Sequence, residues 1–120
     1  MKTLLLLAVL FFGISQLSFA QASDTTLVGH LTDVKCGQTF KSADDAKNHT
    51  KSCALMPACA KSGYALFVDG KLIKFDAQGS KTAKKFLKSL KTERDIKVKV
   101  TGKLNGEQLI VSSIKEASAQ

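Results

Sequence analysis

The sequence has no tryptophan, one proline, one tyrosine and only one long apolar run. That run, Leu4–Ile14, is too short to span a bilayer as a mature helix. Apolar residues make up 44% of the 120 residues, which is too many for a disordered chain, and the length is too short for two ordinary domains. The composition therefore excludes a multidomain enzyme, a polytopic membrane protein and a disordered tail.

The motifs of the common enzyme classes are also missing. The sequence contains no nucleophile elbow, no HExxH, no P-loop, no CxxC pair and no CxxCH haem site. The only adjacent carboxylates, Asp44 and Asp45, are placed like the acidic residues of a helix start. We therefore expect a protein that is not an enzyme.

The first twenty residues have the pattern of a secretory signal peptide. Lys2 provides the positive start, residues 3–14 are apolar, and Ser-Phe-Ala at 18–20 satisfies the small-x-small cleavage rule. We expect cleavage after residue 20, with Ala22 as the second choice and an uncleaved membrane anchor as the alternative. Cleavage would leave one domain, residues 21–120, with a net charge of +7 because Lys2 is lost from a chain of net charge +8. We expect it to be periplasmic or secreted, where disulfides can form, with no integral membrane span.

Five segments predict β-strands from their alternation or their apolar content. They are residues 26–33, 64–68, 71–75, 95–104 and 108–114. Asp69-Gly70 and Asn105-Gly106 predict tight hairpin turns, because both dipeptides tolerate positive φ. Gly29, inside the first segment, predicts a bulge or a close backbone approach.

Two helices are predicted between these strands. Residues 43–56 follow a capping-box pattern at Ser42 and Asp45, and Pro57 ends this helix or opens a new turn. The second helix has Ser80 as its N-cap. Its apolar positions, at helical spacing, are Ala83, Phe86, Leu87 and Leu90. Its other face carries basic residues that are candidates for anion binding: Lys81, Lys84, Lys85, Lys88 and Lys91.

The order of these elements is strand, Cys-rich helical segment, two strands, helix, two strands. We predict a mainly β (β+α) fold, a five-stranded OB-like barrel, because this is the element order of that fold. A helical Cys-rich insert, residues 35–63, lies between strands 1 and 2, and an amphipathic helix lies between strands 3 and 4. The insert and the Asn105-Gly106 turn would flank the face on which OB folds bind ligands. The alternative is another small α+β sandwich.

Several short motifs carry a family resemblance. They are Gly29-His-Leu-Thr-Asp33, Cys36-Gly37, His49, Cys53-Ala54, Cys59-Ala60, Gly63, Asp69-Gly70-Lys71, Val100-Thr-Gly102 and Val111-Ser-Ser-Ile114. On these motifs the chain resembles a group of small exported bacterial OB-like domains of unassigned function, over nearly all of residues 21–120. The resemblance implies a fold and an exported location but no activity.

The three cysteines are an odd number, so they cannot all pair within one chain. On one helix, His49, Cys53 and Met56 would share a face, and Cys36 could be brought over it. Thiolates with imidazole suit Zn²⁺, whereas thiolates with a thioether suit Cu(I). The candidate metal ligands are therefore Cys36, His49, Cys53 and Cys59, with Met56 as an optional ligand in place of Cys59.

Two other interpretations of this cluster stay open. One is a disulfide among Cys36, Cys53 and Cys59 with a spare thiol. A Cys36–Cys53 bridge would close a loop of about 18 residues and contribute about 3 kcal/mol in the loop-entropy model. The other is a plain apolar stripe on the helix. Asp33 could orient a metal ligand, although a strand-end turn residue is the simpler prediction, and His30 is expected to be solvated on the outward strand face.

The function we expect is that of an exported, non-enzymatic OB-like binding domain whose insert is a structural staple beside the ligand face. One alternative is a periplasmic protein that binds zinc or copper, or a thiol-redox protein, at the Cys/His cluster. Another is binding to anionic surfaces through the lysines of the second helix. The partner would be a small ligand or an anionic envelope component. We expect no nucleic acid, because the chain is exported and has few aromatic residues for stacking, and we expect a monomer.

Overall fold

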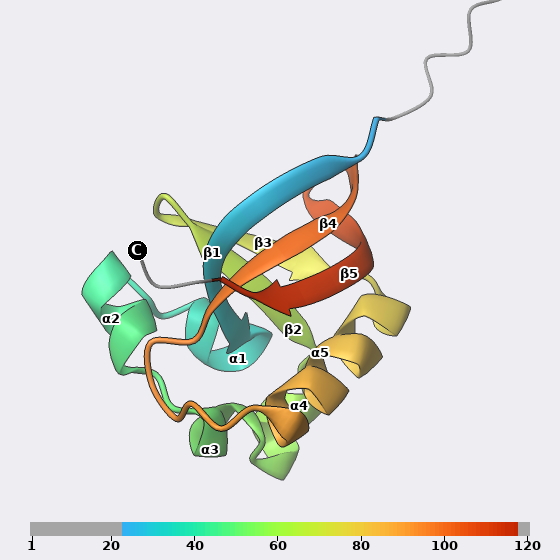
Figure 1. The fold of residues 1–120 in the computed structure, drawn as a ribbon. Coiled ribbons are helices and arrows are strands. Elements are labelled where there is room, and N and C mark those ends of the chain that lie inside the picture. The colour runs from blue at the N-terminus through green and yellow to red at the C-terminus, as the bar shows by residue number, and fades with distance from the viewer. Residues whose placement is uncertain (1–22, 118–120) are drawn as a thin grey trace, which may run out of the picture.

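The computed structural model describes residues 23–117, so the predicted signal peptide and its cleavage site lie outside the described residues. Strands and helices follow one another along this segment as Figure 1 shows. In chain order they are β1 (Thr25–Asp33), α1 (Val34–Gly37), α2 (Ala43–Asn48), α3 (Lys51–Ala54), α4 (Pro57–Lys61), β2 (Tyr64–Val68), β3 (Lys71–Phe75), α5 (Ala77–Ser89), β4 (Lys97–Asn105) and β5 (Gln108–Glu116).

The five strands form one mixed sheet with helices attached to it. Neighbours pair in the order β1-β2-β3-β5-β4, and β4 also pairs with β1, so the pairings form a ring. Four of the pairings are antiparallel. The fifth, between β3 and β5, is parallel and includes only Lys74 with Gln108 and Phe75 with Leu109. The predicted mainly β fold is confirmed, as are the helical insert between β1 and β2 and the helix between β3 and β4.

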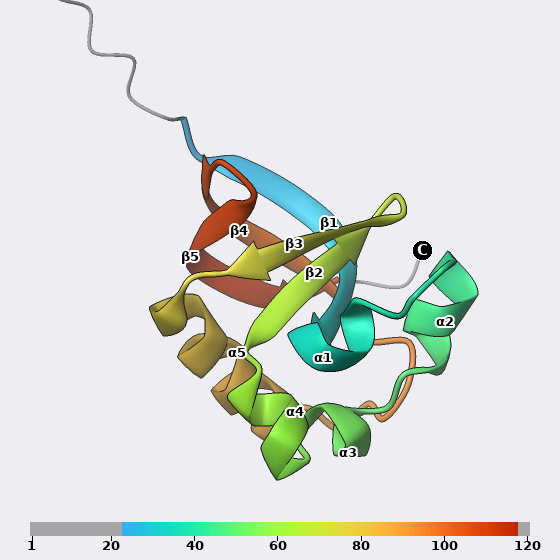
Figure 2. The same cartoon turned by 180° about the vertical axis from the view of Figure 1, so that it is seen from behind.

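The core lies inside the ring and at the end that the helices cover. Alternate residues of β4, such as Val98 and Val100, are fully buried, as the predicted alternation requires. Ala83 and Leu87 bring the apolar face of α5 onto the same core. Figure 2, seen from behind, shows α1, α3, α4 and α5 below the sheet, α2 to one side near the β2–β3 hairpin, and the β4–β5 turn at the far end beside the start of β1. The insert is therefore held at the end of the ring where β1 finishes.

The predictions for tight backbone positions are largely confirmed. A Cβ on Gly29 would lie 2.5 Å from the carbonyl oxygen of Phe67, so β1 and β2 approach closely there. Asp69 and Gly70 both have positive φ, 48° and 78°, as a type I′ turn requires. The second hairpin is shifted by one residue, because Asn105 still pairs with Gln108 and the turn consists of Gly106 and Glu107.

The prediction of one helix over residues 43–56 is wrong. The capping box is present, since the Asp45 carboxylate accepts the Ser42 N–H, but α2 ends at Asn48. His49 is extended, with ψ of 131°, and Thr50 starts α3 by accepting the Cys53 N–H with its side chain. A threonine that caps a new helix competes with continuation of the old one. The segment therefore folds as short helices, with Pro57 opening α4.

The predicted start of the second helix is also wrong. Helix α5 begins at Ala77, and its N-cap is Asp76, whose side chain accepts the Gly79 N–H. The same carboxylate oxygen accepts the Val111 N–H from β5, at 3.0 Å. The Ser80 hydroxyl instead accepts the Tyr64 N–H at the start of β2. Asp76 and Ser80 thus connect α5 to β5 and β2 by hydrogen bonds. These long-range contacts cannot be predicted from the neighbouring residues.

Replacing Asp76 with alanine is expected to lower the free energy of unfolding by about 2–3 kcal/mol. The change removes a helix cap, which contributes about 1 kcal/mol, and leaves the Val111 N–H without its acceptor, which costs a further 1–2 kcal/mol. Urea unfolding of Asp76→Ala beside the control Gln78→Ala, an exposed residue of the same turn, measures the difference. Equal midpoints for the two variants would show that the cap contributes nothing.

Candidate metal centre

The predicted metal ligands come together beside the end of β1. Ligand atoms of Cys36, His49 and Cys53 all lie within 4.8 Å of one another. A second group, Asp33, Cys36 and Cys59, meets the same distance. Cys36 belongs to both groups, so the two groups adjoin each other at its thiol.

The three cysteines occupy equivalent positions in three short helices. Each lies three residues after the N-cap of its helix: Asp33 and Cys36 in α1, Thr50 and Cys53 in α3, Met56 and Cys59 in α4. The caps of α1 and α3 accept the cysteine N–H directly, at 2.9 and 3.0 Å. This repeated cap-x-x-Cys spacing is visible in the sequence and is the local signal that fixes each thiol at a helix start.

Asp33 organises the centre. Its carboxylate is fully buried, and while one oxygen caps α1, the other accepts a hydrogen bond from His49 Nε2 at 2.8 Å. Because Nε2 faces Asp33, Nδ1 is the nitrogen left to bind a metal. Phe40 packs edge-on against the imidazole, with ring centroids 5.4 Å apart. Asp33 therefore caps α1 at the end of β1 and is the hydrogen-bond partner of the candidate ligand His49.

Burial and like charge hold the thiols of Cys36 and Cys59 in their protonated form. Burial, with added repulsion from Asp33 and the other cysteines, raises the pKa of Cys36 to about 12. Burial and the charge of Asp33 also raise the pKa of Cys59. Burial opposes ionisation of Asp33 too, but the hydrogen bonds from His49 and the Cys36 N–H outweigh it and keep its pKa below the usual 3.8. Cys36 and Cys59 are therefore thiols at neutral pH in the metal-free protein.

The other predicted members of the cluster are placed differently. Met56 lies in the extended link before Pro57 and is 54% exposed, which does not favour a thioether ligand or an apolar helix stripe. All three cysteines are free thiols in the structure. The disulfide pairings of Cys36, Cys53 and Cys59 remain predictions.

The expectation of a solvated His30 is wrong. The residue is 9% exposed, and its Nε2 lies 2.6 Å from Asp95 Oδ1. Asp95 has a positive φ of 51°, which turns the chain so that its carboxylate covers the imidazole. His30 does lie on the outward side of β1, as predicted. The segment before β4 folds over this side, so His30 is not solvated.

The same segment, residues 90–95, fastens the stretch of chain that carries His49 and Cys53. The Glu93 carboxylate accepts the Ser52 N–H at 2.9 Å, and the Glu93 carbonyl accepts the Lys51 N–H at 2.8 Å. Arg94 donates to the Asn48 carbonyl at 2.9 Å. Motif analysis did not identify these residues, because they lie more than forty positions from Ser52 and Asn48, the residues to which they bond beside the ligands.

The predicted anion-binding lysines are all exposed to solvent. They comprise Lys81, Lys84, Lys85 and Lys88 on α5 and Lys91 just beyond it. Among the described residues, none of these five forms an ion pair within 4.0 Å. These lysines therefore form an exposed cationic face, as predicted, and the binding of anions by this face remains a prediction.

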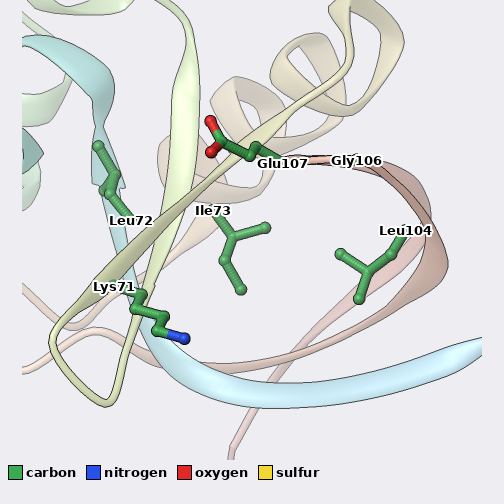
Figure 3. Close-up of a pocket in the computed structure, with 6 residues that line it drawn as sticks. All are labelled: Lys71, Leu72, Ile73, Leu104, Gly106 and Glu107. Atoms are coloured by element: carbon green, nitrogen blue, oxygen red, sulfur yellow. The ribbon is translucent and has the colours of Figure 1, made fainter.

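A cavity of about 530 Å³ opens between β3 and the β4–β5 turn. In Figure 3, Ile73 and Leu104 point toward each other across this opening, with Lys71 and Glu107 at its margins. The outer face of β2 is less accessible, because Phe67 packs edge-on against Phe40 of the insert, with ring centroids 5.6 Å apart. The insert thus covers part of the outer face of β2, whereas the cavity beside the second hairpin is open.

Comparisons of the sequence with protein-family models, with curated proteins and with solved structures gave no match. Within residues 23–117, no helix has the length and apolar content needed to cross a membrane. What supports a function is therefore the arrangement of the side chains in the insert and on the sheet.

Proposed function

We propose that the chain is an exported, non-enzymatic OB-like binding domain whose insert holds a metal ion, Zn²⁺ by preference, as a structural centre. The observation that carries this proposal is the pair of overlapping ligand groups that share Cys36. Cys36, His49, Cys53 and Cys59 together make a Cys₃His set, which is a common structural zinc set. The OB-like barrel and the family resemblance are parts of the same proposal, supported by the ring of strand pairings and the position of the insert.

The donor set and its charge favour Zn²⁺ over Cu(I). A histidine ligand that donates its second ring nitrogen to a carboxylate is the usual arrangement around protein-bound zinc, and His49 with Asp33 has it. Asp33 already places one negative charge beside the thiols, so their deprotonation needs a strong compensating charge. A divalent ion supplies more of it than a monovalent one.

Four protein ligands leave no free coordination position, which is the arrangement of a structural rather than a catalytic site. The insert also needs such a support. Its helices contain four to six residues each, and helices this short are not stable by themselves in water. A metal ion bound by Cys36, Cys53 and Cys59 would tie α1, α3 and α4 to each other and to the end of β1.

The other interpretations of the cluster have less support. A thiol-redox role needs an accessible cysteine of low pKa, whereas Cys59 is buried and the pKa values of Cys36 and Cys59 are raised. A disulfide between Cys36 and either partner would need only a small movement of sulfur atoms. It would, however, leave one thiol and the Asp33–His49 pair without a role.

Native mass spectrometry of the purified protein, followed by alkylation after denaturation, tests the proposal directly. We expect one zinc ion per chain in the native protein and three alkylated cysteines once the metal is lost. Replacement of the ion by Co²⁺ should give the absorption bands of tetrahedral cobalt with thiolate ligands. A native protein with no metal and a single alkylatable thiol would establish the disulfide with a spare cysteine instead.

The segment that supports the ligands should affect metal affinity without contacting the metal. Glu93→Ala is expected to weaken Co²⁺ binding by about tenfold, because Ser52 and the start of α3 lose their carboxylate partner. Glu93→Gln keeps an oxygen acceptor and should restore most of the affinity. Glu107→Ala, an exposed glutamate at the opposite hairpin, is the control. Unchanged affinity in Glu93→Ala would show that the segment does not position the ligands.

The cavity beside Ile73 and Leu104 is the candidate ligand-binding site of this domain. Ligand sites in small β-barrels commonly lie at the mouth, where inward-facing side chains are left uncovered. Leu104 is 44% exposed although it continues the inward row of Val98 and Val100, which are fully buried. We propose this opening as the site for a small, largely apolar ligand.

A further inference from the structure

The outer face of β1, β4 and β5 carries a row of lysines apart from the metal centre and from α5. Lys97, Lys99 and Lys103 are exposed at alternate positions of β4, with Thr101 between the last two. Alternate residues of a strand point to the same side and are about 7 Å apart. In Figure 1 these strands face the viewer, and no helix of the described chain lies in front of their central part.

The charges on this face are not neutralised by the sheet. Lys99 lies directly opposite Lys115 of β5, and both are exposed. Like charges directly opposite each other in an antiparallel pair destabilise it. Within the described residues neither lysine has an ion-pair partner within 4.0 Å. An anionic partner would relieve this repulsion.

Exposed apolar side chains lie among these lysines. Val28 of β1 pairs with Lys99 and is 44% exposed, while Ile110 of β5 pairs with Lys103 and is 42% exposed. Directly paired residues project to the same side of a sheet, so both aliphatic side chains share the face with the lysines. The face contains no Phe, Tyr or Trp on which a nucleic-acid base or a sugar ring could stack, and Asp95 covers the ring of His30.

We propose that this face, formed by Val28, Lys99, Lys103, Ile110 and Lys115, binds the surface of a bilayer that contains anionic lipids. The lysines supply attraction to the lipid headgroups, and the two aliphatic side chains enter the interfacial layer between them. Surface binding of this kind combines charge attraction with burial of apolar area. A soluble polyanion would use the lysines but not the aliphatic residues.

Co-sedimentation with vesicles tests this surface. Wild-type protein should bind vesicles of phosphatidylcholine mixed with phosphatidylglycerol, should bind vesicles of phosphatidylcholine much less, and should be released by salt. The double variant Lys99→Gln/Lys115→Gln should bind about 25-fold more weakly, at about fivefold for each lysine. Its matched control, Lys84→Gln/Lys88→Gln on α5, loses the same charge and should bind nearly as the wild type. Because all variants share one N-terminal sequence, differences between them report this face.

The apolar part of the face needs its own variant. Val28→Ser/Ile110→Ser keeps every charge and should weaken vesicle binding several-fold, with an unchanged circular dichroism spectrum as the check on folding. Absence of wild-type binding, or equal losses in the two lysine double variants, would overturn the proposal. So would undiminished binding of Val28→Ser/Ile110→Ser together with tight heparin binding, because that result would identify a soluble polyanion as the partner.

Discussion

Cys36→Ser is expected to abolish metal binding and to remove the stabilisation that the metal provides. Cys36 is the thiol common to both ligand groups, so no arrangement of the remaining residues replaces it. Its loss should reduce affinity by more than the 10–100-fold typical of losing a supporting hydrogen bond. At a metal concentration about 1,000 times the dissociation constant, bound metal contributes about 4 kcal/mol. The thermal midpoint should therefore fall by about 15–30 °C in a domain of this size.

Chelation of the wild-type protein supplies the matched control for this variant. A strong chelator should lower the wild-type midpoint toward that of Cys36→Ser and should leave the variant unchanged. A thiol reductant should have no effect on either protein, because no disulfide contributes. If the reductant lowers the wild-type midpoint and the chelator does not, Cys36 belongs to a disulfide and the metal proposal is wrong.

Asp33→Ala is expected to have the largest effect on the metal-free fold. The substitution leaves His49 buried without its carboxylate partner and removes the cap of α1. Breaking a buried pair by deleting one member costs about 3–5 kcal/mol, and metal affinity should also fall by about 10–100-fold. Asp33→Asn keeps an oxygen for the cap and should be less harmful in both measurements.

Denaturant unfolding in the presence of a chelator separates the two effects of Asp33. Asp76→Ala is the comparison variant. Asp76 is also a partly buried helix N-cap, but it caps α5, which lies outside the insert. It should lose stability while Co²⁺ binding stays at the wild-type level. If Asp33→Ala retains wild-type metal affinity, then Asp33 is only a cap and the imidazole is not oriented by it.

Strand positions could be predicted from the sequence because their signals are local. Period-two alternation in β4 and the Asp69-Gly70 turn depend on neighbouring residues, and both are confirmed. Helix boundaries were harder to predict from the sequence, because they depend on contacts with distant residues. Asp76 is a cap whose second partner, Val111, is far along the chain, and His49 leaves the helical conformation where its side chain meets Asp33 of another element.

The candidate ligands could be identified by residue type, but for a partly wrong reason. His49 and Cys53 were expected to meet on one continuous helix, whereas they meet because the helix is interrupted at Thr50. His30 was placed on the outer face of β1 correctly, but its burial depends on Asp95, some sixty-five positions later. The contact between His30 and Asp95 has no local signature, since it joins segments that lie far apart along the chain.

The pairing of β1 with β4 also dictates an order of events in folding. β2 with β3 and β4 with β5 are hairpins joined by two-residue turns, and such local pairs form within microseconds. β1 is synthesised first, but its partner strand β4 lies near the other end of the chain. Thr25 of β1, for example, pairs with Gly102 of β4. Closing that long separation is entropically costly and slow. During synthesis, β1 must therefore wait with one edge unpaired until β4 has been made, and closure of the ring at this strand is the expected rate-limiting step.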